Sequence, residues 1–298
     1  MFQQAISPDR HSHNTDFMVI AADRCKSIFR RTERELLRLS SGDKADAVHG
    51  FRTSTRRLQT LLEKLANSGG GKHKKLVKML NRIRRSAGKV RDVDVQLQAL
   101  RSFKVPQEPR RKTQLIQALL ELRAQHEKKL RKLLKKDDIR EIRKRMKRAA
   151  GSLQFDSGPD PLAVARQMLS TVDLSNVADE KTLHHYRIMV KRARYAAEFA
   201  QKSADSAKFL ADLKKLQDAL GNWHDWLTLT HTAVERLGTV NESSLVAALY
   251  NVTRGKFRVA VAAVSASKSQ LISKQEIATV QRPKKKQVAE QRKSAAAA

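Results

Sequence analysis

The sequence lacks the residues that build disulfide-bonded, metal-bound or membrane-spanning proteins. It has a single cysteine, Cys25, so an internal disulfide is excluded, and its cysteine and histidines lack zinc-site spacing. No apolar run reaches the roughly 18 residues of a membrane-spanning helix, and residues 1–16 have no apolar core of a secretion signal. We therefore expect a cytoplasmic protein in a reducing compartment, with no membrane segment, metal or cofactor.

Proline and glycine are also scarce, at 6 and 11 residues. They cluster near 69–71, 106–109 and 158–161, and between these points apolar residues recur every three or four positions. No stretch alternates for long enough to form a strand, so the pattern predicts an all-α fold. We expect helices over 14–39, 44–67, 72–103, 110–150 (broken near Asp137 and Asp138), 160–171, 179–202, 205–237 (broken at Gly221) and 242–272.

Acidic residues are under-represented relative to basic ones. The chain has 61 Lys plus Arg against 30 Asp plus Glu, a formal net charge of +31. Self-repulsion at this net charge destabilises a compact state unless an anion neutralises it. The balance therefore predicts a strongly negative partner.

The chain contains two copies of one pattern. His49 and His184 begin similar segments, and Glu63 and Glu198 follow in the same register. A second anchor, Gly88 to Asp92 in the first half and Gly221 to Asp225 in the second, recurs at nearly the same offset. Two anchors in the same order predict two pseudo-symmetric four-helix bundles from an internal repeat. The expected boundaries are a disordered N-terminus over 1–13, repeats over 14–150 and 151–275, and a disordered basic tail over 276–298.

The first copy places basic residues on one side of a helix. At about 100° per residue, His49, Arg52 and Arg56 fall within an arc of about 60°. The opposite side is apolar, as in a helix packed in a bundle. Its residues are Val48, Phe51, Leu58, Leu61, Leu62 and Leu65.

The second copy repeats this division. One side carries His184, Arg187, Lys191 and Arg194, joined by Tyr195, and the other carries Leu183, Tyr186, Val190, Ala193 and Ala197. Arg57 and Arg192 lie at equivalent flanking positions, between the two sides. We expect loss of the basic residues to weaken anion binding and spare stability, and loss of the apolar ones to do the reverse.

The helix after the first stripe is basic as well. Lys78, Arg82, Arg85 and Lys89 recur at spacings of four, three and four, on one side. In the second copy Lys215 corresponds to Arg82, but the next two positions hold Asp218 and Asn222. The basic groove should therefore be richer in the first half.

These residue types suit a chain of phosphates. Arginine offers forked donors that match phosphate oxygens, lysine a compact charge, and a histidine cation two donors. A single basic helix face is usually only solvated. A histidine at the same position in both copies, when the chain has nine in all, favours a binding role.

The motifs resemble those of the CHAD family, the conserved histidine α-helical domain. The resemblance covers about residues 14–272 and rests on Val-His-x-x-Arg-x-x-x-Arg-Arg from Val48, Leu-His-x-x-Arg-x-x-x-Lys-Arg-x-Arg-Tyr from Leu183, and the two Gly-x-x-x-Asp anchors. It implies two four-helix bundles that bind inorganic polyphosphate, often at polyphosphate granules. Gln59 departs from the pattern, because a basic residue is common there and Arg194 fills the equivalent place.

Catalysis and nucleic-acid binding are the alternatives. CHAD domains often accompany a triphosphate-hydrolysing domain with a Glu-x-Glu-x-Lys strand, but Glu33-Arg34-Glu35 is followed by Leu37 and reads as helix. Asp92, Asp94 and Asp225 are better interpreted as helix caps or arginine partners than as metal ligands, so we expect no catalytic residues.

Weak non-specific nucleic-acid binding is expected, since phosphate contacts dominate that affinity too. However, aromatics make up only 5% of the chain. Because binders of single-stranded nucleic acid stack bases on aromatic side chains, this low content disfavours that function. The basic stretch 126–148 and the lysines at 284–286 are additional anion contacts if they are not simply solvated.

Overall fold

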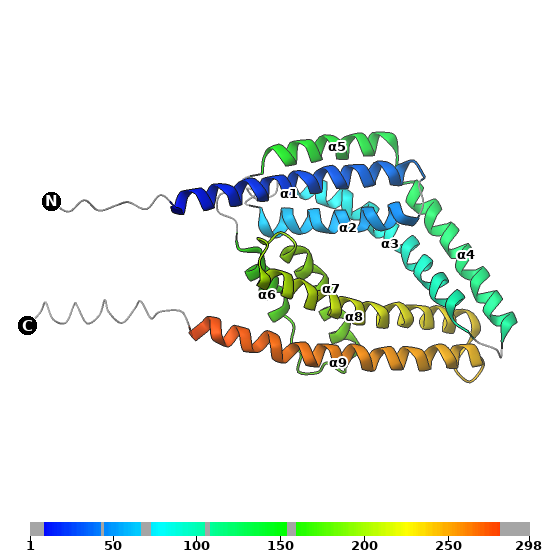
Figure 1. Cartoon of the computed structure of the whole chain (residues 1–298). Helices are drawn as coiled ribbons and strands as arrows, with labels where there is room; N and C mark the ends of the chain where they lie inside the picture. Colours follow the sequence, from blue (N-terminus) through cyan, green and yellow to red (C-terminus); the bar gives the residue numbers. More distant parts are fainter. Residues whose placement is uncertain (1–8, 43–44, 67–72, 105–107, 154–158, 281–298) are drawn as a thin grey trace, which may run out of the picture.

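The structure is a computed structural model that describes residues 9–42, 45–66, 73–104, 108–153 and 159–280. Side chains are described within these ranges from residue 23 to residue 267, except Ala45. Every regular element in this part of the chain is a helix (Figure 1), which confirms the all-α prediction. The elements are α1 Asp9–Ser40, α2 Ala45–Thr60, the π-helical turn η1 Leu61–Leu65, α3 Lys74–Ser102, α4 Pro109–Arg131, α5 Lys136–Gly151, α6 Pro161–Ser170, α7 Glu180–Ala197, α8 Ala204–Leu237 and α9 Ser244–Val280.

Local capping explains several boundaries. The side chain of Asp160 accepts hydrogen bonds from the backbone N–H groups of Leu162 and Ala163 at the start of α6. Asp179 accepts from Thr182 at the start of α7, and Ser203 and Ser206 form a capping box on α8. Each cap satisfies backbone donors that the first helical turn leaves unpaired.

The structure corrects two predicted breaks. The break in the fourth segment lies at residues 132–135, so Asp137 and Asp138 belong to the first turn of α5, where carboxylates interact favourably with the helix dipole. Helix α8 runs unbroken through Gly221, because a single glycine weakens a helix without ending it.

The predicted termini are corrected in part. Residues 9–13 and 276–280, expected to be disordered, lie in α1 and α9. The remainder of both predicted disordered segments, and the glycines at 69–71, fall outside the described residues.

Two of the hydrophobic cores correspond to the two predicted bundles. The first joins α1, α2, η1, α3 and α5 and buries the whole predicted apolar side of the first motif, with Phe51 and Leu58 at 0% exposure. The second joins α6 to α9 and buries the apolar side of the second motif around Tyr186 and Trp223. The structure places both sets as the helical wheel predicts; the repeat itself stays an inference from sequence.

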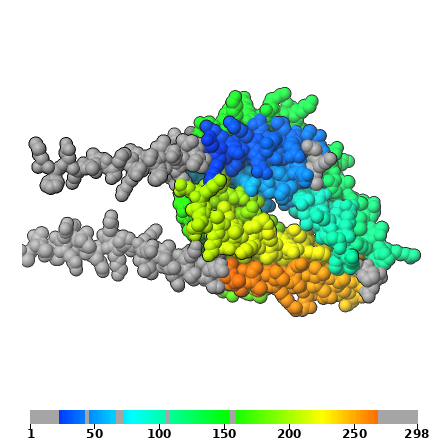
Figure 2. Space-filling model, viewed as in Figure 1, coloured from blue at the N-terminus to red at the C-terminus, as the bar shows by residue number. Residues whose placement is uncertain are grey.

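A third core, which the sequence did not predict, holds the two halves together. It lies where α3 and α4 meet α8 and α9, and its fully buried residues include Leu100, Leu119 and Leu245. At the other end, Phe199 packs into the first core and Arg24 donates a 2.8 Å hydrogen bond to the backbone oxygen of Ala200. Between these two junctions lies an opening, with α2 and α3 on one side and α7 and α8 on the other (Figure 2).

Candidate anion-binding site

The two predicted basic stripes face one another across this opening. Helices α2 and α7 are in contact, and burial, together with the charges of Arg52 and Arg56 on α2, lowers the pKa values of Arg187 and Lys191 on α7. A cavity of about 440 Å³ lies between them. It is lined by Arg56, Gln59, Thr60, Glu63, Lys64, Asn81, Arg84, Arg85, Met168, Arg187, Ile188, Lys191, Arg192 and Tyr195. Residues from the two halves thus form one central site.

The positive charge of the central cavity is only partly neutralised by the protein. Arg52 pairs with Asp92 at 3.2 Å between Nη2 and Oδ1, and the carboxylate of Asp225 acts on Arg187 and Lys191. Within the described part of the chain, neither Arg56 nor Lys191 forms an ion pair. The buried Nε of Arg187 has no hydrogen-bond partner there. An anion that enters this cavity would meet cations that are already in position and whose charges are not fully paired.

Burial and crowding shift the pKa values of these cations downward. Burial, followed by Arg187 and Arg56, lowers the pKa of Lys191 to about 7. Burial, followed by Arg56 and Arg52, lowers the pKa of Arg84 to about 10. Low pKa values mean that the charged forms are destabilised by desolvation and mutual repulsion. A bound anion would offset the repulsion and stabilise the charged forms.

The two motif histidines do not line the central cavity, but the charges of neighbouring arginines act on them. Burial and the charges of Arg91 and Arg52 lower the pKa of His49, and burial and Arg187 lower that of His184. The ring of His184 lies 4.9 Å from that of His224 on α8, whose pKa burial and Arg187 lower to about 3. His49 and His184 are therefore mainly neutral at pH 7 unless an anion approaches them.

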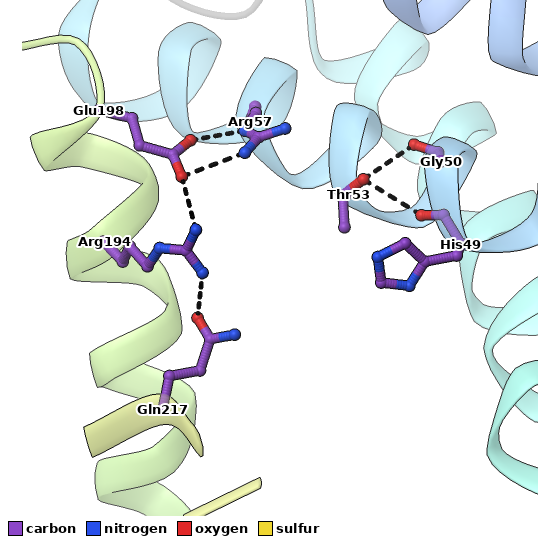
Figure 3. A network of polar contacts seen from close by, with 7 residues as sticks. All are labelled: His49, Gly50, Thr53, Arg57, Arg194, Glu198 and Gln217. Atoms are coloured by element: carbon purple, nitrogen blue, oxygen red, sulfur yellow. Dashed lines mark hydrogen bonds and ion pairs between the residues drawn. The ribbon is translucent and has the colours of Figure 1, made fainter. Parts of the chain in front are cut away.

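Arg57 and Arg194 are bound to a carboxylate of the protein (Figure 3). Arg57 donates to Glu198 at 2.5 and 3.1 Å, Arg194 lies 3.4 Å from the same carboxylate, and Arg194 also donates to Gln217 at 2.9 Å. Since Arg57 belongs to the first half and Glu198 to the second, the network ties the halves together. Arg57 and Arg194 therefore stabilise the fold, and an anion could bind them only in competition with Glu198.

Tyr195 lies with the basic residues on one side of α7, as the helical wheel predicts, and it lines the central cavity. The residue is only 7% exposed, and the guanidinium group of Arg57 lies over its ring, with Cζ 5.9 Å from the ring centroid. The first half covers this side of α7, so the ring offers little surface for a base to stack on.

The basic residues predicted on α3 line a second cavity. This cavity measures about 870 Å³ and contains Lys78, Arg82, Arg85 and Lys89 together with His73, His126 and Lys129. Arg85, Asn81 and Glu63 line both cavities. The basic surface thus continues from the central site across α3.

Two predicted residues lie at the periphery. Arg192 is exposed at the rim of the central cavity. Lys215, with a side chain 82% exposed and 4.0 Å from Asp212, lines neither described cavity. It is the predicted site residue that the structure separates most clearly from the others.

Sequence reasoning missed two residues of the central cluster, Arg84 and His224. Arg84 shares a side of α3 with Asn81 and Gly88, at spacings of three and four, so proximity to the Gly88 anchor was an available signal. His224 lies inside the second anchor, between Gly221 and Asp225. Asp92, interpreted from the sequence as a helix cap or an arginine partner, pairs with Arg52 of α2.

The described residues show no cluster of metal-ligating side chains and no helix long and apolar enough to cross a membrane.

Comparisons with known proteins agree with the architecture. A model of the CHAD domain matches residues 21–234. The crystal structure of the CHAD domain from the plant Ricinus communis is similar, with a TM-score of 0.59 at 17% identity over 84% of this chain and 92% of that chain. PptA from Streptomyces chartreusis has a TM-score of 0.62 at 14% identity over 85% and 98%. No curated protein matches the chain.

Proposed function

This chain belongs to the CHAD domain family, and on that premise we propose that it binds inorganic polyphosphate in the central cavity without hydrolysing it. The observation that carries the proposal is the convergence of Arg56, Arg187 and Lys191, from both halves, on one cavity. Their charges repel one another and are only partly balanced by Asp225. A polyanion supplies the missing negative charge and hydrogen-bond acceptors.

The site favours a phosphate chain over a nucleic acid. Sequence-tolerant binders of single strands stack bases on aromatic side chains, but Tyr195, the one aromatic among the described residues that line the central cavity, is buried beneath Arg57. Trp226 is paired with Phe103 at the third core. A site that has cations but no aromatic stacking surface suits polyphosphate, which carries phosphates and no bases.

Non-catalytic binding fits the positions of the carboxylates. Asp92 holds Arg52, and Asp225 lies among Arg187 and Lys191, with a pKa raised by burial. Both carboxylates are thus occupied in balancing cations. By extension from the family resemblance, we propose a cytoplasmic location at polyphosphate granules.

A direct competition tests this function. Long-chain polyphosphate should displace labelled single-stranded and duplex DNA of equal total charge at physiological salt, and its affinity should fall steeply as salt rises, because phosphate contacts release counterions. Incubation with polyphosphate, with or without a divalent cation, should release no free phosphate. Tighter binding to DNA would favour the nucleic-acid alternative, and phosphate release would make the protein an enzyme.

Binding should strengthen as pH falls from about 8 to about 6. A polyanion stabilises protonated Lys191, His49 and His184, so their pKa values rise on binding and the complex takes up protons. With a free-state pKa of about 7, Lys191 contributes most near neutrality, and the histidines, whose pKa values start lower, contribute toward pH 6. Isothermal titration in two buffers of different ionisation enthalpy measures the proton uptake.

Two variants assign that pH dependence. Lys191→Met should remove most of it between pH 7 and 8, whereas the His49→Gln, His184→Gln double variant should reduce it toward pH 6. Lys215→Met, which alters an exposed lysine outside both cavities, is the control. A pH dependence that is the same in all four proteins would contradict the assignment.

A further inference from the structure

The central cavity holds two lysines in different surroundings. Lys64, on η1, is exposed, whereas Lys191, on α7, is partly buried. The Lys191 amine makes no ion pair or hydrogen bond within the described part of the chain. Because it nevertheless faces the cavity, a small molecule that enters can reach it.

The charges around Lys191 come from several of the surrounding elements. Cations are contributed by Arg187 and Arg192 on the same helix, Arg52 and Arg56 on α2, Lys64 on η1, and Arg84 and Arg85 on α3. Anions are fewer, namely Asp225 on α8 and Glu63 on η1. Burial and the excess of cations hold the pKa of Lys191 near 7.

This environment makes the amine a nucleophile at neutral pH. With a pKa of about 7, Lys191 is unprotonated to a large extent at pH 7, compared with roughly one in three thousand for an ordinary lysine. Desolvation and adjacent cations are the conditions that activate lysines toward electrophilic carbon. The same cations bind phosphate, so a reagent that carries both a phosphate and an electrophilic carbonyl would be oriented by them.

We propose that Lys191 is a site of acylation by small acyl phosphates. The phosphate group binds the guanidinium groups of Arg56, Arg84 and Arg187. The short acyl group lies toward Ile188, which is one helical turn from Lys191 and also lines the cavity.

The reaction balances without a further reactant. The lone pair of Nζ attacks the carbonyl carbon, a C–N bond forms, and the bond from that carbon to the phosphate oxygen breaks. The phosphate leaves with the electron pair and takes up the proton that the amine loses. The product is a neutral amide at Lys191 and hydrogen phosphate.

Acylation would remove one cation from the cavity and fill part of its volume. The inference goes beyond polyphosphate binding and shares with it only the cavity's cations. If that binding is also correct, acylated protein should bind polyphosphate more weakly than unmodified protein.

The test is site-resolved acetylation of the full chain by acetyl phosphate at pH 7, followed by peptide mass spectrometry. Lys191 should be modified at least tenfold faster than Lys64, which shares the cavity but is exposed, and than Lys215, which lies outside it. The rate at Lys191 should reach half of its maximum near pH 7 and level off, whereas the rate at Lys215 should keep rising with pH. In Lys191→Arg this modification should be absent.

A second reagent separates orientation by the cations from simple amine reactivity. N-acetoxysuccinimide acetylates amines but carries no phosphate. The rate of Lys191 acetylation by acetyl phosphate, divided by the rate of Lys191 acetylation by N-acetoxysuccinimide, therefore measures the contribution of phosphate binding. That ratio should fall at least threefold in Arg56→Gln, with circular dichroism confirming an unchanged helical content.

Acetylation of Lys191 no faster than of Lys215, or a ratio unchanged in Arg56→Gln, would overturn the proposal. Polyphosphate binding is measured on the same preparation. Binding without selective acetylation overturns only this inference, and selective acetylation without binding overturns only the proposed function.

Discussion

The double variant Arg56→Met, Lys191→Met is expected to bind polyphosphate at least about a hundredfold more weakly than the unaltered protein. Charge-assisted hydrogen bonds contribute roughly 1.5 to 3 kcal/mol each, and both side chains face the central cavity from opposite halves. Methionine keeps most of the side-chain volume and removes the charge. Fluorescence anisotropy with end-labelled polyphosphate at fixed salt measures the loss.

The same variant is expected to be more stable than the unaltered protein when no anion is present. The two cations repel each other and their neighbours, so replacing these partly buried, unpaired charges by apolar groups should raise the free energy of unfolding. Arg187 is left in place because it balances Asp225. Thermal and urea unfolding, followed by circular dichroism, should show a higher midpoint for the variant, whereas added polyphosphate should stabilise the unaltered protein more.

The matched control removes two exposed cations from α8, with Lys215→Met and Arg236→Met. Both residues are exposed and neither lines a described cavity. The control variant has the same net charge as the double variant and should lose only a small part of the affinity. An equal loss in both would show that total charge, rather than the central cavity, determines binding.

This expectation differs from the one drawn from the helical wheel, under which the basic stripes are exposed and their loss spares stability. In the structure the side chain of Arg52 is 19% exposed and Lys191 is partly buried. The free protein therefore carries a destabilising cluster of cations that ligand binding would neutralise. Binding sites commonly lower the stability of the protein that carries them, because the side chains that bind a ligand are not the ones that pack best.

Phe51→Ala is expected to lower the free energy of unfolding by roughly 3 to 5 kcal/mol. Phe51 is 0% exposed in the first core, so truncation removes buried apolar surface and leaves a cavity among well-packed neighbours. Because domains are stable by only about 5 to 15 kcal/mol, the variant should unfold at markedly lower temperature. Urea titration monitored by helical circular dichroism gives the free energy.

Leu120→Ala on α4 is the control, since Leu120 is 38% exposed and its loss should change stability by less than about 1 kcal/mol. Below its unfolding transition, Phe51→Ala should bind polyphosphate as the unaltered protein does. Similar stability losses in both variants would contradict the core assignment, and weakened binding by folded Phe51→Ala would contradict the separation of the core from the site.

Local sequence was enough for the helices and for the division of their faces. An α-helix has a fixed period, so the spacing of Phe51, Leu58 and Leu62 specifies which side is buried, whatever lies opposite. The same spacing placed His49, Arg52 and Arg56 on the other side. The break between α4 and α5 was found only approximately and the predicted break at Gly221 was wrong, because packing against neighbouring helices overrides weak local preferences.

Only the tertiary structure decided that the two basic stripes form one site. Arg57 meets Glu198 across the two halves, and the third core closes the opposite end of the opening. These contacts join residues far apart in the chain, and no local periodicity encodes them. Desolvation and charge–charge repulsion depend on distance in space, so the low pKa of Lys191, the burial of Tyr195 and the place of Arg84 in the cluster follow from how the halves pack.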